Sequence, residues 1–429
     1  MAAHQSTILD QAVAPPRRRA PWTACVASSR RPRWLLAAVV LAAYWPSLGQ
    51  VFLLDDYRNL QCFAEYQDGT RDHLGLYEFV QSPDEVRRQR KNGDLPWWVS
   101  DNLRFAYFRP LSERFLWAQY QIFGQHPLGY RLVSLGLYVL GLWLVLSLYR
   151  QWIQDETVAR WAAVLFAVAS CNAIPVAFVA SQCDLLALIA CLSTLLCITR
   201  FARGGSPGWL VLAMPIYSAG LLSKEASIAA ALLPLGLLWI AGRSQSFGRP
   251  CVSTRRVFLA TALLTVMALG FTYYHASGGY GSNGALMLHP IHDPLSYLTR
   301  MPFRVLMLLT SWLIPINPLA TYLNNEQWLL PLAYAAAGAA GLACVGTLIW
   351  RRFGQLPPIR AFTFWGLIFL PLLACTCPDN RVMMLPMVGL SALAAVWLCG
   401  GLPAYPMRDH PGDDAPETQR PIQRLPLVL

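Results

Sequence analysis

Long runs of apolar residues, separated by short polar segments that contain arginine, recur along most of this chain. A run of about 20 apolar residues is long enough to cross a bilayer as a helix. The main apolar runs occupy residues 34–54, 128–149, 161–172, 176–199, 257–274, 328–350, 361–376 and 382–402. With one further hairpin, this pattern predicts an all-α, polytopic membrane protein with a bundle of about 10–11 transmembrane helices.

Two further apolar segments need the charge pattern for their interpretation. Residues 209–241 are too long for one span and short for two, and Lys224 and Glu225 lie in their middle. A hairpin with these two residues at its outer turn keeps the arginines that follow on the cytoplasmic side, as the positive-inside rule favours. Residues 301–316 are short and carry Arg304. We interpret them as re-entrant or interfacial, because a full span would place the arginines of residues 351–360 outside.

The polar segments define the expected domain organisation. A basic, disordered cytoplasmic tail at 1–33 precedes a transmembrane domain at 34–402, and a disordered cytoplasmic tail follows at 403–429. Within the transmembrane domain, residues 54–126 are expected to form a first periplasmic loop and residues 275–327 a second one. Apolar positions at helical spacing in residues 111–123 predict an interfacial helix in the first loop. The glycine-rich run 278–284 predicts a mobile outer flap in the second.

The composition agrees with a membrane protein. Hydrophobic residues are 55% of the chain, charged residues are 13%, and the mean hydropathy is +0.38; soluble domains have about twice that share of charge. The net charge of +11 comes almost entirely from arginine, since Lys91 and Lys224 are the only lysines. We expect this excess on the cytoplasmic face, where it orients the spans and meets anionic membrane lipids. Nucleic acid is not an expected partner.

Metal-ligating side chains occur in two short clusters. Cys375 and Cys377 are two positions apart, and His289 and His292 stand beside Asp293. Neither cluster has a second ligand pair at the spacing of zinc sites, so metal ligation is the weaker alternative. Most of the 11 cysteines lie in apolar segments, where a thiol is a small buried hydrophobe, and no disulfide framework is indicated.

Asp55 and Asp56 follow the first apolar run directly, in FLLDDYRNL. We expect them at the C-terminus of that helix, where they would face the negative end of the helix dipole. Fold stability does not require an acidic pair at this position, so function is the favoured explanation; the alternative is a hydrated stop to the helix. Asp184 lies about two turns inside the outer end of its span, at a cost on the order of 1 to 3 kcal/mol unless it has a partner or a task.

The predicted topology brings charged residues from distant segments to one side of the membrane. They are Asp55, Asp56, Arg109, Asp184, Lys224, Glu225 and Arg381, with Glu113 and Asp379 nearby in sequence as supporting candidates. A carboxylate in such a cluster can remove a proton from a hydroxyl group, and a cation can stabilise the charge that grows on a leaving phosphate. Transfer from a lipid-phosphate donor requires both functions.

Structural roles remain alternatives for several of these residues. Asp184 could make only a polar contact between helices, Lys224 and Glu225 could form an ion pair with each other at the hairpin, and Arg381 could be an interfacial anchor. His126 and His275 are expected at the interface without a role in the site.

Short motifs in the same order resemble the GT-C superfamily of integral-membrane glycosyltransferases, which includes protein O-mannosyltransferases, TMTC-type mannosyltransferases and lipid A aminoarabinose transferases. The motifs are FLLDDYRNL, FRPLSERFLW, GQHPLGYRLVSLGLY, ASQCDLLALIACL, LLSKEAS and DNRVMMLPMVGL, spread over most of residues 34–402. The resemblance implies transfer of a sugar from a polyprenyl-phosphate-linked donor to a protein, lipid or glycan acceptor on the outer face. It also implies a bacterial inner-membrane enzyme whose active site faces the periplasm.

The resemblance implies roles for individual residues. Asp55 corresponds to the catalytic base with Asp56 next to it, although relatives often have Asp-Glu here, and Asp184 corresponds to a supporting acid. Arg109, Lys224 and Arg381 are the candidates that hold the carrier phosphate. The paired acids could hold Mg²⁺ or Mn²⁺ through oxygen ligands. Two other functions stay open: a transporter or flippase of lipid-linked sugars, and a non-catalytic assembly factor for cell-envelope glycans.

Overall fold

The computed structural model describes residues 32–93, 95–97, 99–153, 155–241, 252–283, 287–290, 293–322 and 329–401. The two predicted tails lie outside these ranges, apart from residues 32 and 33 at the start of the first described helix. Gly284 at the end of the glycine-rich run and His292 of the histidine cluster also lie outside them.

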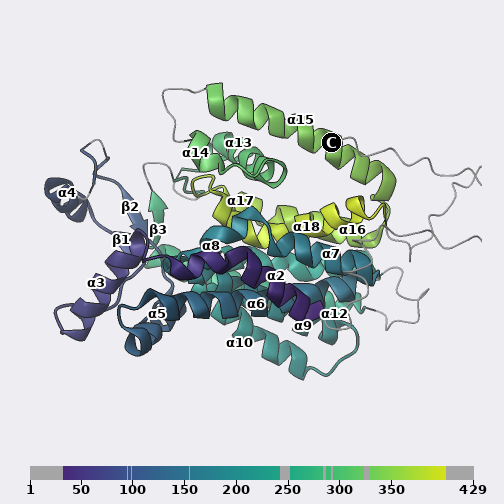
Figure 1. Cartoon of the computed structure of the whole chain (residues 1–429), viewed down its shortest axis with the longest axis horizontal. Coiled ribbons are helices and arrows are strands. Elements are labelled where there is room, and N and C mark those ends of the chain that lie inside the picture. Colours follow the sequence, from purple (N-terminus) through teal and green to yellow (C-terminus); the bar gives the residue numbers. More distant parts are fainter. Residues whose placement is uncertain are drawn as a thin grey trace, which may run out of the picture.

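A bundle of apolar helices forms the main body of the molecule (Figure 1). Within the described residues, five helices are long and apolar enough to cross a membrane, and they contain α6 (Pro127–Trp152), α9 (Gln182–Ala202), α12 (Thr254–Ser277), α15 (Leu329–Phe353) and α18 (Met384–Leu398). A sixth candidate is a pair bent by 50°, made by α7 (Glu156–Ala167) with η2 (Ser170–Asn172) and α8 (Ala173–Ala177). The predicted all-α, polytopic architecture is confirmed.

Shorter apolar helices complete the bundle. They are α2 (Pro32–Tyr44) with η1 (Trp45–Gly49), α10 (Gly208–Ser223), η4 (Glu225–Leu235) with α11 (Gly236–Ala241), and α16 (Pro357–Ile368) with α17 (Leu370–Leu373). Small residues let some of these helices approach closely, as is common between helices in membranes. A Cβ on Gly389 of α18 would lie 2.3 Å from the carbonyl oxygen of Phe362 in α16, so only glycine fits at that crossing.

The predicted hairpin in residues 209–241 is present. Tyr217 Oη of α10 donates to the carbonyl of Ile228 (3.2 Å), and Ser227 Oγ donates to the carbonyl of Gly220 (2.9 Å). These contacts bring positions before and after Lys224 side by side, and Lys224 itself is extended. The chain therefore reverses at Lys224 and Glu225, as the arginine pattern predicted.

Helix α13 (Pro294–Leu313) is followed by the short α14 (Pro318–Tyr322), and α13 is not among the membrane-crossing candidates. Tyr297 Oη near its start donates to the carbonyl of Pro371 (2.8 Å), and Asn317 just after its end donates to Asp379 (3.2 Å). Both flanks of α13 thus contact residues 371–379 at one end of the bundle. This agrees with the re-entrant or interfacial interpretation.

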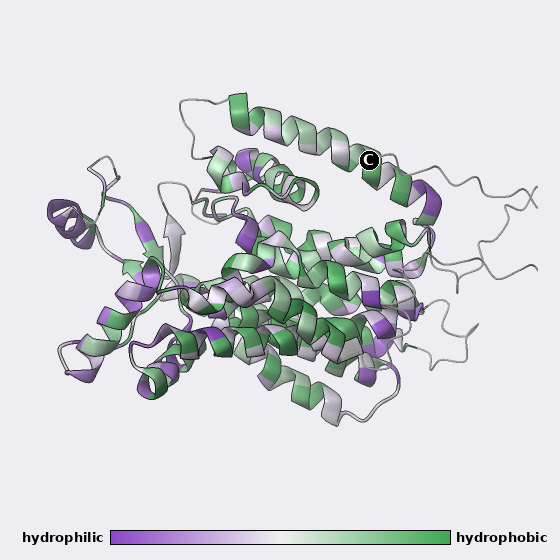
Figure 2. Ribbon diagram, in the orientation of Figure 1, coloured by the Kyte–Doolittle hydropathy of each residue, from purple (hydrophilic) through white to green (hydrophobic). Residues whose placement is uncertain are grey.

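A more polar lobe projects from one end of the bundle (Figures 1 and 2). It contains α3 (Asp55–Gln67), β1 (Glu78–Val80), α4 (Pro83–Asn92), β2 (Arg104–Ala106) and α5 (Pro110–Phe123). Helix α5 buries Ser112, Leu116 and Gln119 and exposes Leu111 and Ile122. The exposed apolar side chains agree with the interfacial helix predicted there.

Within the glycine-rich run, which was predicted to be a mobile flap, residues 281–283 form a strand. Strand β3 (Gly281–Asn283) pairs antiparallel with β2, which pairs antiparallel with β1. Gly279 has a left-handed backbone conformation with φ +76, and a Cβ there would lie 2.9 Å from the guanidinium of Arg104. The glycines therefore serve a tight approach to β2, which sequence composition alone does not distinguish from a loose loop.

The two ends of the bundle differ in charge. At the end opposite the lobe, Arg203 bonds the side chain of Gln151 (3.3 Å), and Arg256 donates to the carbonyls of Phe201 (2.8 Å) and Gly205 (2.9 Å). These contacts place Arg203, which follows α9, and Arg256, in the first turn of α12, at one end of the bundle with the end of α6. The acidic candidates lie at the other end, next to the lobe.

Candidate functional site

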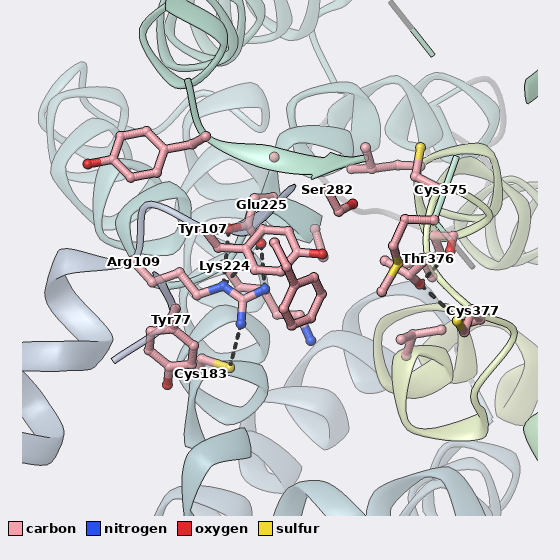
Figure 3. Close-up of a pocket in the computed structure, with 18 of the residues that line it drawn as sticks. Tyr77, Tyr107, Arg109, Cys183, Lys224, Glu225, Ser282, Cys375, Thr376 and Cys377 are labelled. Atoms are coloured by element: carbon pink, nitrogen blue, oxygen red, sulfur yellow. Dashed lines mark hydrogen bonds and ion pairs between the residues drawn. The ribbon is translucent and has the colours of Figure 1, made fainter. Parts of the chain in front are cut away.

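A cavity of about 450 Å³ lies where the lobe meets the end of the bundle. Its walls come from α3, β2, β3, the start of α9, the turn between α10 and η4, the end of α12 and residues 372–382. Figure 3 shows part of this cavity, with Arg109 and Lys224 on one side and Cys375, Thr376 and Cys377 on the other. Of the predicted site residues, Asp55, Arg109, Asp184, Lys224, Glu225, Asp379 and Arg381 line it.

Asp55 and Asp56 are not equivalent. Asp55 and Asn59, four positions apart on α3, line the cavity. Asp56 is buried on another side of the helix, where its carboxylate accepts hydrogen bonds from the amides of Leu53 (3.1 Å) and Ala180 (2.8 Å). Asp56 therefore ties α3 to η3 (Val179–Ser181), while Asp55 is the acid of the pair that faces the cavity.

The expected position of this pair at a helix C-terminus was wrong. The first apolar helix ends at Gly49, and both acids stand in the first turn of the next helix, α3. A carboxylate in the first turn faces the positive end of the helix dipole, so the dipole stabilises it. Burial nevertheless raises the pKa of Asp55, and the charges of Arg381 and Arg58 offset this only in part.

Lys224 and Glu225 each pair with a residue on another element. The alternative that they form an ion pair with each other was wrong. Lys224 Nζ forms an ion pair and hydrogen bond with Asp184 Oδ1 at the start of α9. Glu225 forms a bidentate ion pair with Arg109, with a shortest distance of 2.7 Å between Nη2 and Oε2. The hairpin turn is thereby tied to α9 and to the start of α5.

Arg109 is held on several sides. Its guanidinium carbon lies 4.8 Å from the ring centre of Tyr77 and 4.6 Å from that of Tyr107. Its Nη1 also approaches the sulfur of Cys183 at 3.7 Å (Figure 3). With Glu225 as well, these contacts fix the side chain, of which 13% is exposed. Arg109 is thus better suited to shape the electric field of the cavity than to reach toward a ligand.

The side chain of Arg381 is more exposed than those of Arg109 and Lys224. Its Nε pairs with Asp379 Oδ2 at 3.1 Å, and 40% of its side chain is exposed compared with 13% for Lys224. Asp379 is itself fixed, because it accepts from Asn317 and from the backbone amide of Arg381 at the start of η6 (Asn380–Met383). Arg381 lines the cavity, so it is placed where it could contact a ligand as well as anchor the chain at the interface.

Glu113 does not line the cavity. Its side chain interacts with the backbone of Leu76 and Tyr77. Burial, together with the neighbouring charge of Glu78, raises its pKa to about 7. Glu113 thus contacts the backbone of two cavity-lining residues without lining the cavity itself, and its supporting role stays a prediction.

Several cavity residues were not predicted. His275 was expected to have no role, yet it lines the wall with Tyr107 and His289. His289 follows Leu288, whose amide bonds the carbonyl of Cys375 at 2.8 Å. Pairing of β2 with β3 brings these side chains together, and strands of three residues carry no readable alternation in the sequence. The one feature of the sequence that indicated His275 as a cavity residue was its position at the outer end of a predicted span.

The part of the chain that the structure describes contains no cluster of side chains suited to ligate a metal ion. No group of three or more His, Cys, Asp or Glu side chains is close enough there to share an ion. The paired acids that could hold Mg²⁺ or Mn²⁺, Asp55 and Asp56, face different surroundings: Asp55 lines the cavity, while Asp56 accepts from two backbone amides.

A family of mannosyltransferases matches part of this chain. Residues 109–274 match the model of a family described as dolichyl-phosphate-mannose-protein mannosyltransferase. The protein O-mannosyl-transferase Tmtc1 of Drosophila melanogaster is 32% identical over 126 residues, which are 29% of this chain and 15% of that relative. The chain thus matches only a small part of that relative's length. These matches confirm the resemblance to the GT-C superfamily.

Two solved structures align with this chain at low scores. One is ArnT from Cupriavidus metallidurans bound to undecaprenyl phosphate, with a TM-score of 0.40, 15% identity, and coverage of 85% of this chain and 59% of that one. The other is the Archaeoglobus fulgidus oligosaccharyltransferase tethered to an acceptor peptide, with a TM-score of 0.39, 14% identity, and coverage of 88% and 49%.

Proposed function

We propose that this chain is a membrane glycosyltransferase that moves a sugar from a polyprenyl-phosphate donor to a hydroxyl-bearing acceptor. The observation that carries the proposal is the single cavity lined by Asp55, by the Lys224–Asp184 and Arg109–Glu225 ion pairs and by Arg381. It combines an acid that can take a proton with cations that can stabilise a phosphate. The matched mannosyltransferase family supports the same reaction type.

In the proposed reaction, Asp55 removes the proton of the acceptor hydroxyl. The acceptor oxygen bonds to the anomeric carbon of the sugar as the bond from that carbon to the carrier phosphate oxygen breaks. The polyprenyl phosphate leaves with the bonding electron pair, and the sugar inverts its configuration. Burial raises the pKa of Asp55, which brings it nearer the value that suits a general base at neutral pH.

Among the candidate cations, we assign the first contact with the carrier phosphate to Arg381. All three are paired with an acid, but the side chain of Arg381 is 40% exposed, compared with 13% for Lys224 and for Arg109. Lys224 would act as a second contact, and Arg109 as a fixed positive charge behind it. An arginine binds phosphate through its fork of N–H donors without losing its charge.

We further propose that the cavity opens at the periplasmic face of a bacterial inner membrane. The arginines around Gln151, Phe201 and Gly205 lie at the opposite end of the bundle. The positive-inside rule favours the cytoplasm for that end. A flippase or transporter would instead need functional charges along a path through the midplane, whereas the candidate acids gather at one end.

The test is transfer by an Asp55→Asn variant. We expect its turnover to fall by about 10²- to 10⁴-fold, the usual contribution of a general base. Transfer would be measured with the purified full chain and a polyprenyl-phosphate sugar, after mass analysis of surface glycans from cells with and without the gene has named donor and acceptor. Asp68→Asn, at the exposed end of the same helix, is the matched control and should retain full turnover. Normal transfer by Asp55→Asn would overturn the proposal.

A further inference from the structure

The connection that leads into α3 has an unusual backbone conformation. Leu54 has φ 39 and ψ −110, and it is the one non-glycine residue with positive φ among the described residues. Its side chain is 83% exposed, so its own packing does not explain this conformation. Such a residue costs about 1–3 kcal/mol and persists only when its surroundings hold it in place. Asp55, the proposed base, is the next residue.

Asp56 holds this connection from one side. Its carboxylate accepts from the amide of Leu53, while its own amide donates to the carbonyl of Leu53 at 2.8 Å, so the two residues close a turn around Leu54. The other carboxylate oxygen accepts from the amide of Ala180. The turn is thereby attached to the bundle and cannot rotate freely.

Arg131 of α6 holds the connection from the other side. Its side chain is 0% exposed, and its Nη2 donates to the carbonyl of Val51 at 2.6 Å. Its Nε and Nη1 have no hydrogen-bond partner among the described residues. A buried guanidinium with so few hydrogen bonds requires a neighbouring negative charge. The charge of Asp56 acts on Arg131 and offsets the cost of its burial in part, and Arg131 does the same more weakly for Asp56.

We propose that Asp56 and Arg131 are a pair of positioning residues that lock the strained turn at Leu54 and so fix Asp55 on the cavity wall. The assignment of Asp55 as the group positioned in this way rests on the proposed function. Without the lock, Leu54 would relax to negative φ and carry Asp55 away from its place. A displacement of about 1 Å is sufficient to lower turnover by about 100-fold.

The lock is tested first by Arg131→Gln. We expect kcat to fall by about 10- to 100-fold with little change in the KM for the lipid-linked donor, because the cations that bind the phosphate are untouched. Hydrogen exchange at the amides of Leu53 and Asp56 should become faster, since both belong to the locked turn. If Arg131→Gln does not fold, Arg131→Lys keeps the buried charge but loses the forked reach to Val51, and the same changes are expected from it.

Rescue distinguishes a lock from general loss of structure. Glycine adopts the backbone conformation of Leu54 without strain, so adding Leu54→Gly to the arginine variant should restore much of its kcat. Leu54→Ala removes nearly the same side-chain atoms but keeps the Cβ and the strain, and it should restore none. Equal effects of glycine and alanine, or an arginine variant with the kcat and amide exchange of the parent chain, would overturn the proposal.

The two proposals fail separately. Hydrogen exchange at Leu53 and Asp56 reports the lock whether or not the chain transfers a sugar. If Asp55→Asn retained normal transfer while Arg131→Gln accelerated exchange, the role of Asp55 as base would fall and the lock would stand. If exchange stayed slow, the lock would fall whatever the result for Asp55.

Discussion

The Arg109–Glu225 and Arg150–Glu156 ion pairs join the same types of side chain at opposite ends of the bundle. Their shortest distances are similar, 2.7 and 2.5 Å. In both pairs the arginine donates hydrogen bonds to both carboxylate oxygens. Arg109 and Glu225 have side chains 13% and 16% exposed, whereas Arg150 and Glu156 are 32% and 44% exposed. The distances and hydrogen bonds are therefore alike at the two ends, and only the exposed fractions of the side chains differ.

Burial and chain separation do distinguish them. Arg109 and Glu225 are 116 positions apart and connect the lobe to the hairpin turn, and Tyr77 and Tyr107 cover the guanidinium. Arg150 and Glu156 are six positions apart and join the ends of neighbouring helices at the surface. Breaking a buried pair leaves an uncompensated charge, while an exposed charge is solvated by water. The same pair should thus organise the site at one end and contribute little at the other.

The largest effect is expected from Glu225→Ala. Removing the carboxylate leaves Arg109 buried without its counter-charge, which should lower the stability of the folded chain by about 3 to 5 kcal/mol. Thermal and denaturant unfolding of the purified protein in detergent would measure this loss. The double variant with Arg109→Met should recover part of it, because the orphaned charge is then removed as well. A loss below about 1 kcal/mol would show that burial does not separate the two pairs.

The next effect concerns Arg381, the more exposed cation of the cavity. Arg381→Gln should lower kcat/KM for the lipid-linked donor by about 10- to 100-fold, equivalent to about 1.5 to 3 kcal/mol for hydrogen bonds to a charged group. Stability should change little, since the Arg381 side chain is 40% exposed. Steady-state kinetics at varied donor concentration would measure the change. Unchanged kinetics would move the phosphate contact to Lys224.

The third effect is a pH dependence of stability, and it should distinguish Glu113 from Glu225. The neighbouring charge of Glu113 is the acid Glu78, whereas that of Glu225 is the arginine Arg109. Burial and this acidic neighbour raise the pKa of Glu113 from 4.5 to about 7. The folded state therefore favours its protonated form, and that stability is present below about pH 4.5 and lost as pH rises through 7. Glu113→Gln should remove on the order of 1 to 2 kcal/mol of this decline. Unfolding measured from pH 4.5 to 8 provides the test, with Asp68→Asn as the control that keeps the parent's slope.

The bundle and the side of the cavity were predictable because they depend on patterns along the chain. Apolar runs fix the spans, and the arginines fix which ends lie together, so the hairpin at Lys224 and the clustering of Asp55 with Asp184 followed from position alone. The re-entrant interpretation of residues 301–316 followed from the same count. These features need no knowledge of which side chains touch.

The pairing of the site residues was not predictable, because it depends on contacts between distant segments. Lys224 and Glu225 are adjacent, but their partners are 40 and 116 positions away. Asp55 and Asp56 separate into a cavity residue and a buried one because α3 begins at Asp55, after a positive φ at Leu54. Leucine gives no sequence signal for that conformation, since glycine is the residue that usually adopts it.

The smallest effect is expected from Glu156→Gln at the arginine-rich end. Glu156 bonds both Arg150 and Arg160, so a count of ion pairs alone would rank it above Glu225. We expect a loss of no more than about 1 kcal/mol and unchanged turnover, because exposed pairs are weakened by water and salt. Unfolding at low and high salt would measure it, and only this variant's small loss should shrink as salt rises. A loss as large as that of Glu225→Ala would mean that the arginine-rich end organises the fold as strongly as the cavity end, and that burial is not what sets the two apart.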